Sequence, residues 1–242
     1  MKYTMKPTQL SYGEAIGILL IENYVPFIPG DVANATSYSF PVRFEPLPGL
    51  TPERLFAHDR SLLGEVVAAA KRLARAGVRA ITGDCGFLAI YQEAIAAEVG
   101  VPVFLSSLLQ LDFIARIVGE KGRIGIVTAN RTALTPDLLE AVTSVPADRL
   151  LLAGLEDREH FVSAVFREEG VLDSAIVERE VLESVETIRG EGDLRAILLE
   201  CSLLPPYAAA VQERTGLPVF DYNTMINYVH QAVVAPRFRG HM

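Results

Sequence analysis

Apolar residues follow two alternating patterns along the chain, short continuous runs and longer stretches with helical spacing. Continuous runs at 14–21, 78–82, 101–105, 123–128, 150–153, 194–199 and 219–220 predict strands buried on both faces of a parallel sheet. Helical spacing predicts helices at 53–76, 87–99, 107–118, 132–143, 156–169, 173–189, 204–215 and 224–234. Strands that alternate with helices indicate an α/β protein with parallel sheets.

Residues 22–52 interrupt this alternation and are predicted to form one long irregular segment. The segment holds six of the fourteen prolines and five aromatic residues, which is too apolar for a solvated linker. Long ordered loops in compact domains usually serve a function. We therefore expect either a cover over a substrate, with polar contacts from Asn34, Thr36, Ser37 and Tyr38, or a packing or dimer contact.

One segment of the chain occurs twice. Residues 78–107 and 194–223 align without a gap at an offset of 116, with 11 of 30 positions identical. The only two cysteines, Cys85 and Cys201, occupy equivalent positions in this alignment. Such a match indicates that one supersecondary unit was used twice. We expect two similar halves, a first domain of residues 1–120 and 220–242 and a second of residues 121–219, with the thiols facing each other.

Composition and charge exclude several classes of function. Half of the residues are apolar and the net charge is −8, which argues against nucleic acid or an anionic membrane as a partner. No apolar run is long enough to span a bilayer, and the first residues lack a signal-peptide pattern. We expect a cytoplasmic protein, in which thiols stay reduced.

The two cysteines are the candidate reactive groups. Each follows a predicted strand and precedes a predicted helix, and ligands of parallel sheets lie at this end of the strands. The positive end of the helix dipole and free backbone N–H groups favour the thiolate and lower the thiol pKa. One thiolate could remove a proton next to a carbonyl while the other thiol returns a proton to the opposite face. The preceding Asp84 and Glu200 are expected to point away, because side chains alternate along a strand.

Other chemistries lack the residues they need. Neither of the glycine-rich phosphate-binding motifs is present, and the four histidines lack metal-ligand spacing, so we expect no cofactor and no metal. A cysteine–histidine hydrolase would need His58 or His160 as its base and would leave one thiol unexplained.

The chain resembles the aspartate/glutamate racemase superfamily, above all its hydantoin-racemase-like and uncharacterised members. The resemblance rests on GDCGFLAIYQ and LLECSLLPPYA around the cysteines, on GVPVF and GLPVF after them, and on IPGDVANATSYSFPV. It implies two pseudo-symmetric α/β domains, each a mostly parallel sheet flanked by helices, with the site in the cleft between them. It also implies catalytic Cys85 and Cys201 and a homodimer.

The resemblance further suggests the residues that contact the substrate. It places Thr128 and Asn130 near a substrate carboxylate, and it assigns backbone N–H donors to the residues after each cysteine, Gly86 and Ser202. Racemases of free glutamate or aspartate carry polar residues beside these positions, whereas this chain has Phe87 and Leu203. This departure favours a cyclic or N-substituted amino-acid derivative.

Three functions follow as hypotheses. The first is a cofactor-independent racemase or epimerase of an amino acid or derivative, acting on a small molecule with a carboxylate or carbonyl. The second is a cis–trans isomerase or a decarboxylase of a small dicarboxylate in the same superfamily. The third is a small-molecule binding protein without catalysis, since a fold alone does not establish chemistry.

Overall fold

The computed structural model describes residues 2–242, so that only the first residue of the predicted domain 1–120 lies outside it. Its strands are β1 (Ile16–Ile21), β2 (Val42–Leu47), β3 (Ala80–Gly83), β4 (Arg123–Thr128), β5 (Leu150–Gly154), β6 (Leu194–Leu199) and β7 (Val219–Phe220). Its α-helices are α1 (Pro52–Phe56), α2 (Leu63–Ala76), α3 (Gln92–Glu98), α4 (Leu111–Ile117), α5 (Pro136–Glu140), α6 (Glu159–Phe161), α7 (Ser174–Arg189), α8 (Ala208–Thr215) and α9 (Tyr222–Val233).

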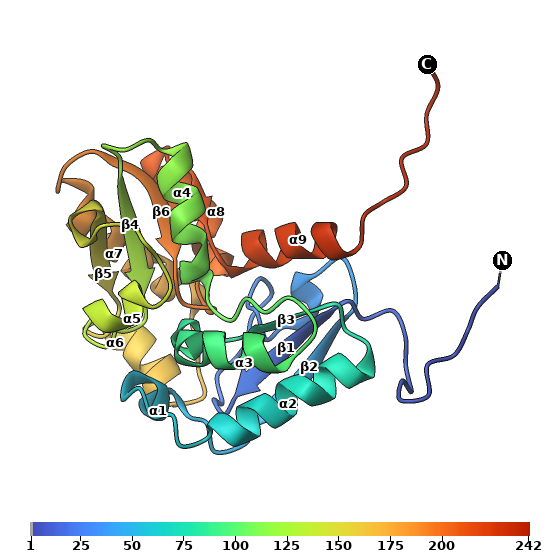
Figure 1. The fold of residues 1–242 in the computed structure, drawn as a ribbon. Coiled ribbons are helices and arrows are strands. Elements are labelled where there is room, and N and C mark those ends of the chain that lie inside the picture. The colour runs from blue at the N-terminus through green and yellow to red at the C-terminus, as the bar shows by residue number, and fades with distance from the viewer. Residues whose placement is uncertain (1) are drawn as a thin grey trace.

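The strands form two parallel sheets, which confirms the predicted fold class. The first sheet has the order β2-β1-β3 and the second has the order β5-β4-β6-β7. All pairs within them are parallel. Figure 1 shows the two sheets in separate halves of the molecule, with helices on the faces of each.

The helix that follows each repeat packs against the sheet of the other half. In the first sheet, Ile16 and Ile18 of β1 belong to one cluster with Tyr222 and Ile226 of α9. Figure 1 shows α9 running beside this sheet, whereas α4 lies beside β4 and β6 of the second sheet. The two halves therefore exchange a helix. The predicted domain boundary after residue 120 stays a prediction.

Equivalent backbone hydrogen bonds confirm the sequence repeat. The N–H of Ile81 donates to the carbonyl of Pro102 at 2.9 Å, and the N–H of Ile197 donates to that of Pro218 at 3.0 Å. The first pair lies 116 positions before the second, which is the offset of the sequence alignment. Leu88 and Leu204 donate in the same way to the carbonyls of the two cysteines. The duplicated unit is thus the same local structure used twice.

Five of the expected segments are wrong in detail. The segment 22–52 contains β2, a strand at the edge of its sheet. Pro46 is tolerated there because an edge strand has no neighbour on its outer side that would need a backbone N–H. The helix expected at 53–76 breaks between α1 and α2, where His58 has a φ of 52°. The helix expected at 156–169 is α6 followed by a π-helix at Val162–Phe166, and that at 132–143 shortens to α5. Instead of a strand at 101–105, a single bridge joins Ile81 and Val103.

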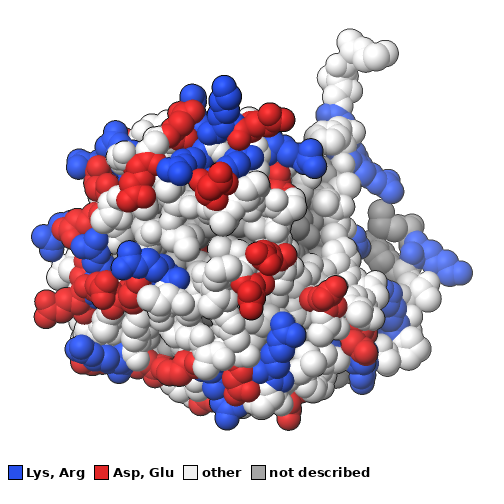
Figure 2. Space-filling model, turned by 60° about the vertical axis from the view of Figure 1, so that its left-hand side comes forward, with Lys and Arg blue, Asp and Glu red and all other residues white. Residues whose placement is uncertain are grey.

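The surface carries mixed charge. Figure 2 shows Lys and Arg interspersed with Asp and Glu over one face, without a continuous basic area. Among residues 2–242, no helix is long and apolar enough to cross a membrane.

Candidate active site

The two cysteines follow the carboxyl ends of β3 and β6 in matching local structures. Cys85 is the N-cap of the 3-10 helix Gly86–Tyr91, which continues into α3. Cys201 lies shortly before the 3-10 helix Pro205–Tyr207, which continues into α8. Both cysteines are free. The chain leaves each strand through a turn that presents a thiol at the sheet edge where ligands of parallel sheets bind.

Hydrogen bonds between the halves bring the two strand ends together. The hydroxyl of Ser202 donates to the carbonyl of Asp84, and the hydroxyl of Ser107 donates to the carbonyl of Glu200 at 3.0 Å. The groups involved are buried. These bonds hold the two cysteine turns in one place, and both Cys85 and Cys201 line the same pocket.

The thiol pocket is narrow in this structure. Its lining consists of Ile21, Asn23, Phe27, Pro52, Phe56, Asp84, Cys85, Gly86, Phe87, Ala129, Val165, Phe166, Glu200, Cys201, Ser202 and Leu203. Its cavity volume is about 30 Å³, which is room for about one water molecule. A second cavity of about 230 Å³ shares Ile21, Asn23, Phe27 and Asp84 with it. A substrate would have to widen the thiol pocket or extend into this neighbouring space.

Asp84 and Glu200 also belong to the lining of the thiol pocket. The carboxyl group of Glu200 lies against Gly86 in the turn of the other cysteine, which the expectation that it points away did not foresee. Asp84 accepts a hydrogen bond from the N–H of Ile21 at 2.9 Å. Glu200 accepts one from the hydroxyl of Thr128 at 2.8 Å through Oε2, whereas its buried Oε1 has no partner. Burial raises the pKa of each carboxyl to about 7, against the effect of these hydrogen bonds.

Gly86 provides the space that Glu200 occupies. A Cβ atom on Gly86 would lie 1.5 Å from Oε1 of Glu200, far inside any contact distance. The carboxyl oxygen without a partner therefore lies directly against the backbone that follows Cys85. The sequence contains a signal for this arrangement. The residue after the first cysteine is a glycine, and the residue before the second cysteine is a glutamate.

The surroundings of the thiols favour the protonated form, whereas the helix termini were expected to favour the thiolate. Burial raises the pKa of Cys85 well above its usual value, and the charge of Glu200 raises it further, as do those of Cys201 and Asp84. Burial and the charge of Glu200 also raise the pKa of Cys201. Hydrogen bonds from the N–H groups of Phe87 and Leu203 act in the opposite direction but are outweighed.

Four of the predicted substrate contacts lie at the pocket, namely Gly86, Phe87, Ser202 and Leu203. Thr128 is buried and reaches the site through its hydrogen bond to Glu200. Asn34 and Asn130 are not part of the pocket lining. Their role as substrate contacts stays a prediction that this arrangement does not favour.

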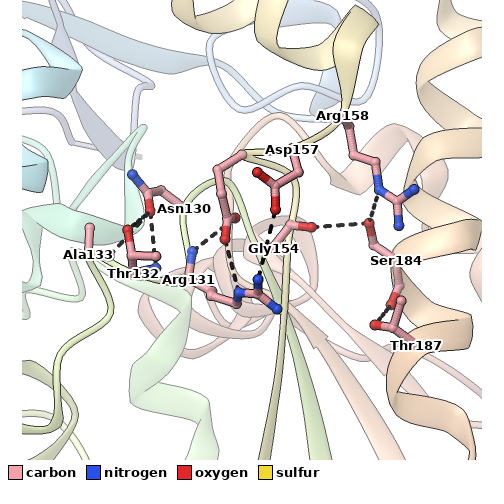
Figure 3. A network of polar contacts seen from close by, with 10 residues as sticks. Asn130, Arg131, Thr132, Ala133, Gly154, Asp157, Arg158, Ser184 and Thr187 are labelled. Carbon is pink, nitrogen blue, oxygen red and sulfur yellow. Dashed lines mark hydrogen bonds and ion pairs between the residues drawn. The ribbon is translucent and has the colours of Figure 1, made fainter.

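The side chains of both asparagines are engaged in turns. Asn34 caps the 3-10 helix Ala35–Ser37 and donates to the carbonyl of Phe27 at 2.9 Å. Asn130 accepts from the N–H and the hydroxyl of Thr132, at 3.0 and 2.6 Å, and from the N–H of Ala133. Figure 3 shows Asn130 in this turn, at one end of a polar network.

Sequence reasoning missed the outer wall of the pocket. Phe56 and Phe166 line it from the end of α1 and from the π-helix, far apart in the chain. Neither position stands out in the sequence. Phe27 belongs to the segment expected to form either a substrate cover or a packing contact, and it lines the pocket. Asn23 lines both cavities, and its buried Oδ1 has no partner.

Known proteins resemble this chain in sequence and in fold. The sequence profile of the Asp/Glu/hydantoin racemase family matches residues 49–226. A dimethylsulfoniopropionate lyase from Durusdinium sp. clade D is 30% identical over 234 residues, which cover 93% of this chain and 77% of that protein. Dimethylsulfoniopropionate lyase 5 from Emiliania huxleyi is 34% identical over 231 residues, which cover 90% of this chain but only 45% of that protein.

Solved structures show the same fold at low sequence identity. The aspartate racemase of Picrophilus torridus has a TM-score of 0.60 at 13% identity, covering 94% of this chain and 96% of that one. Unliganded arylmalonate decarboxylase has a TM-score of 0.58 at 18% identity, covering 93% and 94%. The repeat, the paired strand-end cysteines and the profile match together show that this chain belongs to the Asp/Glu/hydantoin racemase family of enzymes.

Proposed function

We propose that this protein is a cofactor-independent lyase. It would remove a proton from the carbon next to a carboxylate and expel a dialkyl sulfide from the following carbon, as in the cleavage of dimethylsulfoniopropionate. The observation that carries this proposal is that a pocket lined by two thiols occurs in a chain 30% to 34% identical to named dimethylsulfoniopropionate lyases. This reaction takes the place of amino-acid racemisation as the leading hypothesis, and it is related to the decarboxylase hypothesis because both need one proton-transfer group.

The thiols and the backbone around them suit this elimination. A thiolate of Cys85 or Cys201 takes the α-proton, so that a C–H bond breaks and an S–H bond forms. The electron pair left on carbon forms the new C=C bond, while the β-carbon–sulfur bond breaks and its electrons leave with neutral dimethyl sulfide. Acrylate remains. The thiol is then protonated, as in the resting site, and it passes this proton to water before the next α-proton is removed.

Backbone donors beside the thiols would stabilise the charge that develops on the substrate carboxylate. Gly86 and Ser202 line the pocket and directly follow the two thiols in the chain, so their N–H groups would be the donors. Fixed donors in a buried site need no reorganisation when negative charge builds up, which is why they accelerate such steps.

A second candidate function is a racemase or epimerase of an amino-acid derivative. The observation that favours it is the presence of both thiols at one pocket, because an elimination needs only one base. In this reaction the second thiol would return a proton to the opposite face of the same carbon.

A substrate panel distinguishes the two candidates. The purified chain is incubated in deuterated water with dimethylsulfoniopropionate, aspartate, glutamate, a 5-substituted hydantoin and phenylmalonate. We expect dimethyl sulfide in the headspace and acrylate in the proton spectrum from the first compound. The Cys85→Ala/Cys201→Ala variant is the control for non-enzymatic elimination. Exchange of the α-hydrogen in an amino acid or hydantoin, without dimethyl sulfide from the first compound, would reject the lyase in favour of the racemase.

A further inference from the structure

The thiol pocket has an aromatic wall, formed by Phe27, Phe56, Phe87 and Phe166. The rings of Phe56 and Phe87 meet edge to face at 4.9 Å, and those of Phe56 and Phe166 do so at 5.6 Å. Phe87 is almost fully buried, while the other three are only partly covered. Aromatic faces that remain open toward a pocket attract cations through the negative charge of the ring face.

Two acidic residues line the same pocket as this aromatic wall. Glu200 is 1% exposed, and its Oε1 lies against Gly86 without any hydrogen-bond partner. Asp84 is 6% exposed and lines the same pocket. A buried carboxyl oxygen without a partner is costly, so a ligand that supplies a partner would be bound favourably here.

No positive side chain balances these carboxyl groups. Among residues 2–242, no Lys, Arg or His lines the thiol pocket or the neighbouring cavity. The charged groups that raise the pKa of the thiols are all acidic, namely Asp84 and Glu200 for both, Asp31 for Cys201 and Cys201 for Cys85. A ligand that carries only negative charge would be repelled, and so would a thiolate.

We propose that the aromatic wall and the free oxygen of Glu200 form a subsite for an onium cation of the substrate, a sulfonium or a quaternary ammonium group. This inference rests on the proposed function for its substrate class. The bound cation would be the positive charge that the site lacks, so that the substrate itself makes ionisation of a thiol favourable. The step is a proton transfer from the thiol to water, in which the S–H bond breaks and its electron pair stays on sulfur.

The direction of the pKa shifts agrees with this role. Burial and negative neighbours raise the pKa of both thiols, and burial raises the pKa of Asp84 and Glu200 to about 7. An opposite charge placed nearby lowers the pKa of all these groups. Binding of an onium ligand near neutral pH should therefore release protons, and its affinity should rise with pH.

A matched pair of ligands tests the subsite. The ligand 3-(trimethylammonio)propionate and its uncharged-tail counterpart 4,4-dimethylpentanoate have the same shape and the same carboxylate. Titration calorimetry with the whole chain, in buffers of different ionisation enthalpy at pH 6, 7 and 8, gives affinity and proton exchange. We expect the onium ligand to bind about 10- to 30-fold more tightly and to release about one proton. Its affinity should rise from pH 6 to 8, while that of the carboxylate with the uncharged tail should fall.

Single substitutions test which side chains produce the preference for the onium ligand. Glu200→Gln keeps the shape but should reduce the release of protons, and Phe56→Leu or Phe166→Leu should bring the two affinities closer together. The matched control is Phe113→Leu, an exposed ring that pairs with Phe220 at 6.5 Å outside this pocket. It should leave the preference for the onium ligand unchanged.

Two results would overturn the inference. One is equal binding of both ligands by the wild-type chain. The other is uptake of protons when the onium ligand binds, which would mean that protonated carboxyl groups donate hydrogen bonds to the carboxylate of the ligand. The release of dimethyl sulfide is measured separately. Lyase activity without a preference for the onium ligand would reject only the subsite, and a preference without lyase activity would reject only the proposed lyase.

Discussion

Replacing Gly86 with alanine should disable the site through a single clash. The new Cβ would lie 1.5 Å from Oε1 and 2.4 Å from Cδ of Glu200, and 3.1 Å from its carbonyl oxygen. Reaching an ordinary contact of about 3.4 Å requires the carboxyl oxygen to move by about 2 Å (3.4 − 1.5). The nearby carbonyl oxygen belongs to the backbone and cannot swing aside. The carboxyl group must therefore leave its hydrogen bond with Thr128.

The cost of this movement can be estimated. Overpacking a buried site costs about 1–3 kcal/mol, and loss of a hydrogen bond to a buried group adds about 1–2 kcal/mol. A total of about 3 kcal/mol corresponds to a fall in Tm of roughly 6–12 °C for a chain of this length. Since Gly86 follows Cys85 directly, we also expect the turnover of the substrate to fall by at least about 100-fold.

A double-mutant cycle checks this estimate. Tm and the free energy of unfolding are measured for Gly86→Ala, Glu200→Ala and the combined variant. Removing the glutamate side chain should relieve the clash, so the combined loss should be smaller than the sum by about 1–2 kcal/mol. Additive effects, or a Gly86→Ala variant as stable and as active as the wild type, would show that Glu200 does not lie against Gly86.

Two further predictions concern stability. The pKa of Glu200 is raised to about 7 in the folded state, so the folded state binds more protons than the unfolded state above pH ~4.5, and stability should fall as pH rises through 7. Denaturant unfolding at pH 5.5 and 8 should show a smaller loss in Glu200→Gln than in the wild type, and equal losses would contradict this pKa shift. Asp221 caps α9 through a hydrogen bond from the N–H of Thr224 at 2.7 Å. Asp221→Ala should lower the free energy of unfolding by about 1–2 kcal/mol, whereas Asp221→Asn should retain most of it, and two equally stable variants would refute the cap.

The sequence predicted the fold well because the fold repeats. The alternation of apolar runs and helical spacing, together with the 116-residue offset, indicates two similar parallel-sheet halves. Elements that lie at a sheet edge or whose form depends on tertiary packing were not predicted. β2 lies at an edge and alternates apolar and polar residues around Pro46, so it does not look like a buried strand. The break at His58 and the π-helix at Val162–Phe166 depend on tertiary packing, which no periodic pattern records.

The candidate site was predictable only in part. Cys85 and Cys201 were identified because the repeat aligns them and places both after strands. The orientation of Glu200 was not, because pleat alternation holds only within a strand and the chain leaves β6 at Leu199. Phe56 and Phe166 come from separate helices, so only the folded chain brings them together. The effect of burial on the thiols was missed as well, because it raises the pKa of Cys85 and outweighs the hydrogen bond from the N–H of Phe87.

The most direct test of the central claim is the rate at which single-cysteine variants release dimethyl sulfide from dimethylsulfoniopropionate. Cys85→Ser and Cys201→Ser are compared with the wild type, using substrate with hydrogen or deuterium on the α-carbon. If a thiol removes the α-proton, at least one variant should lose about 100- to 10,000-fold in kcat, and the wild type should be slower with deuterium. Wild-type rates in both variants, or the same slow rate in all three proteins, would contradict the claim that these thiols carry out the proton transfer.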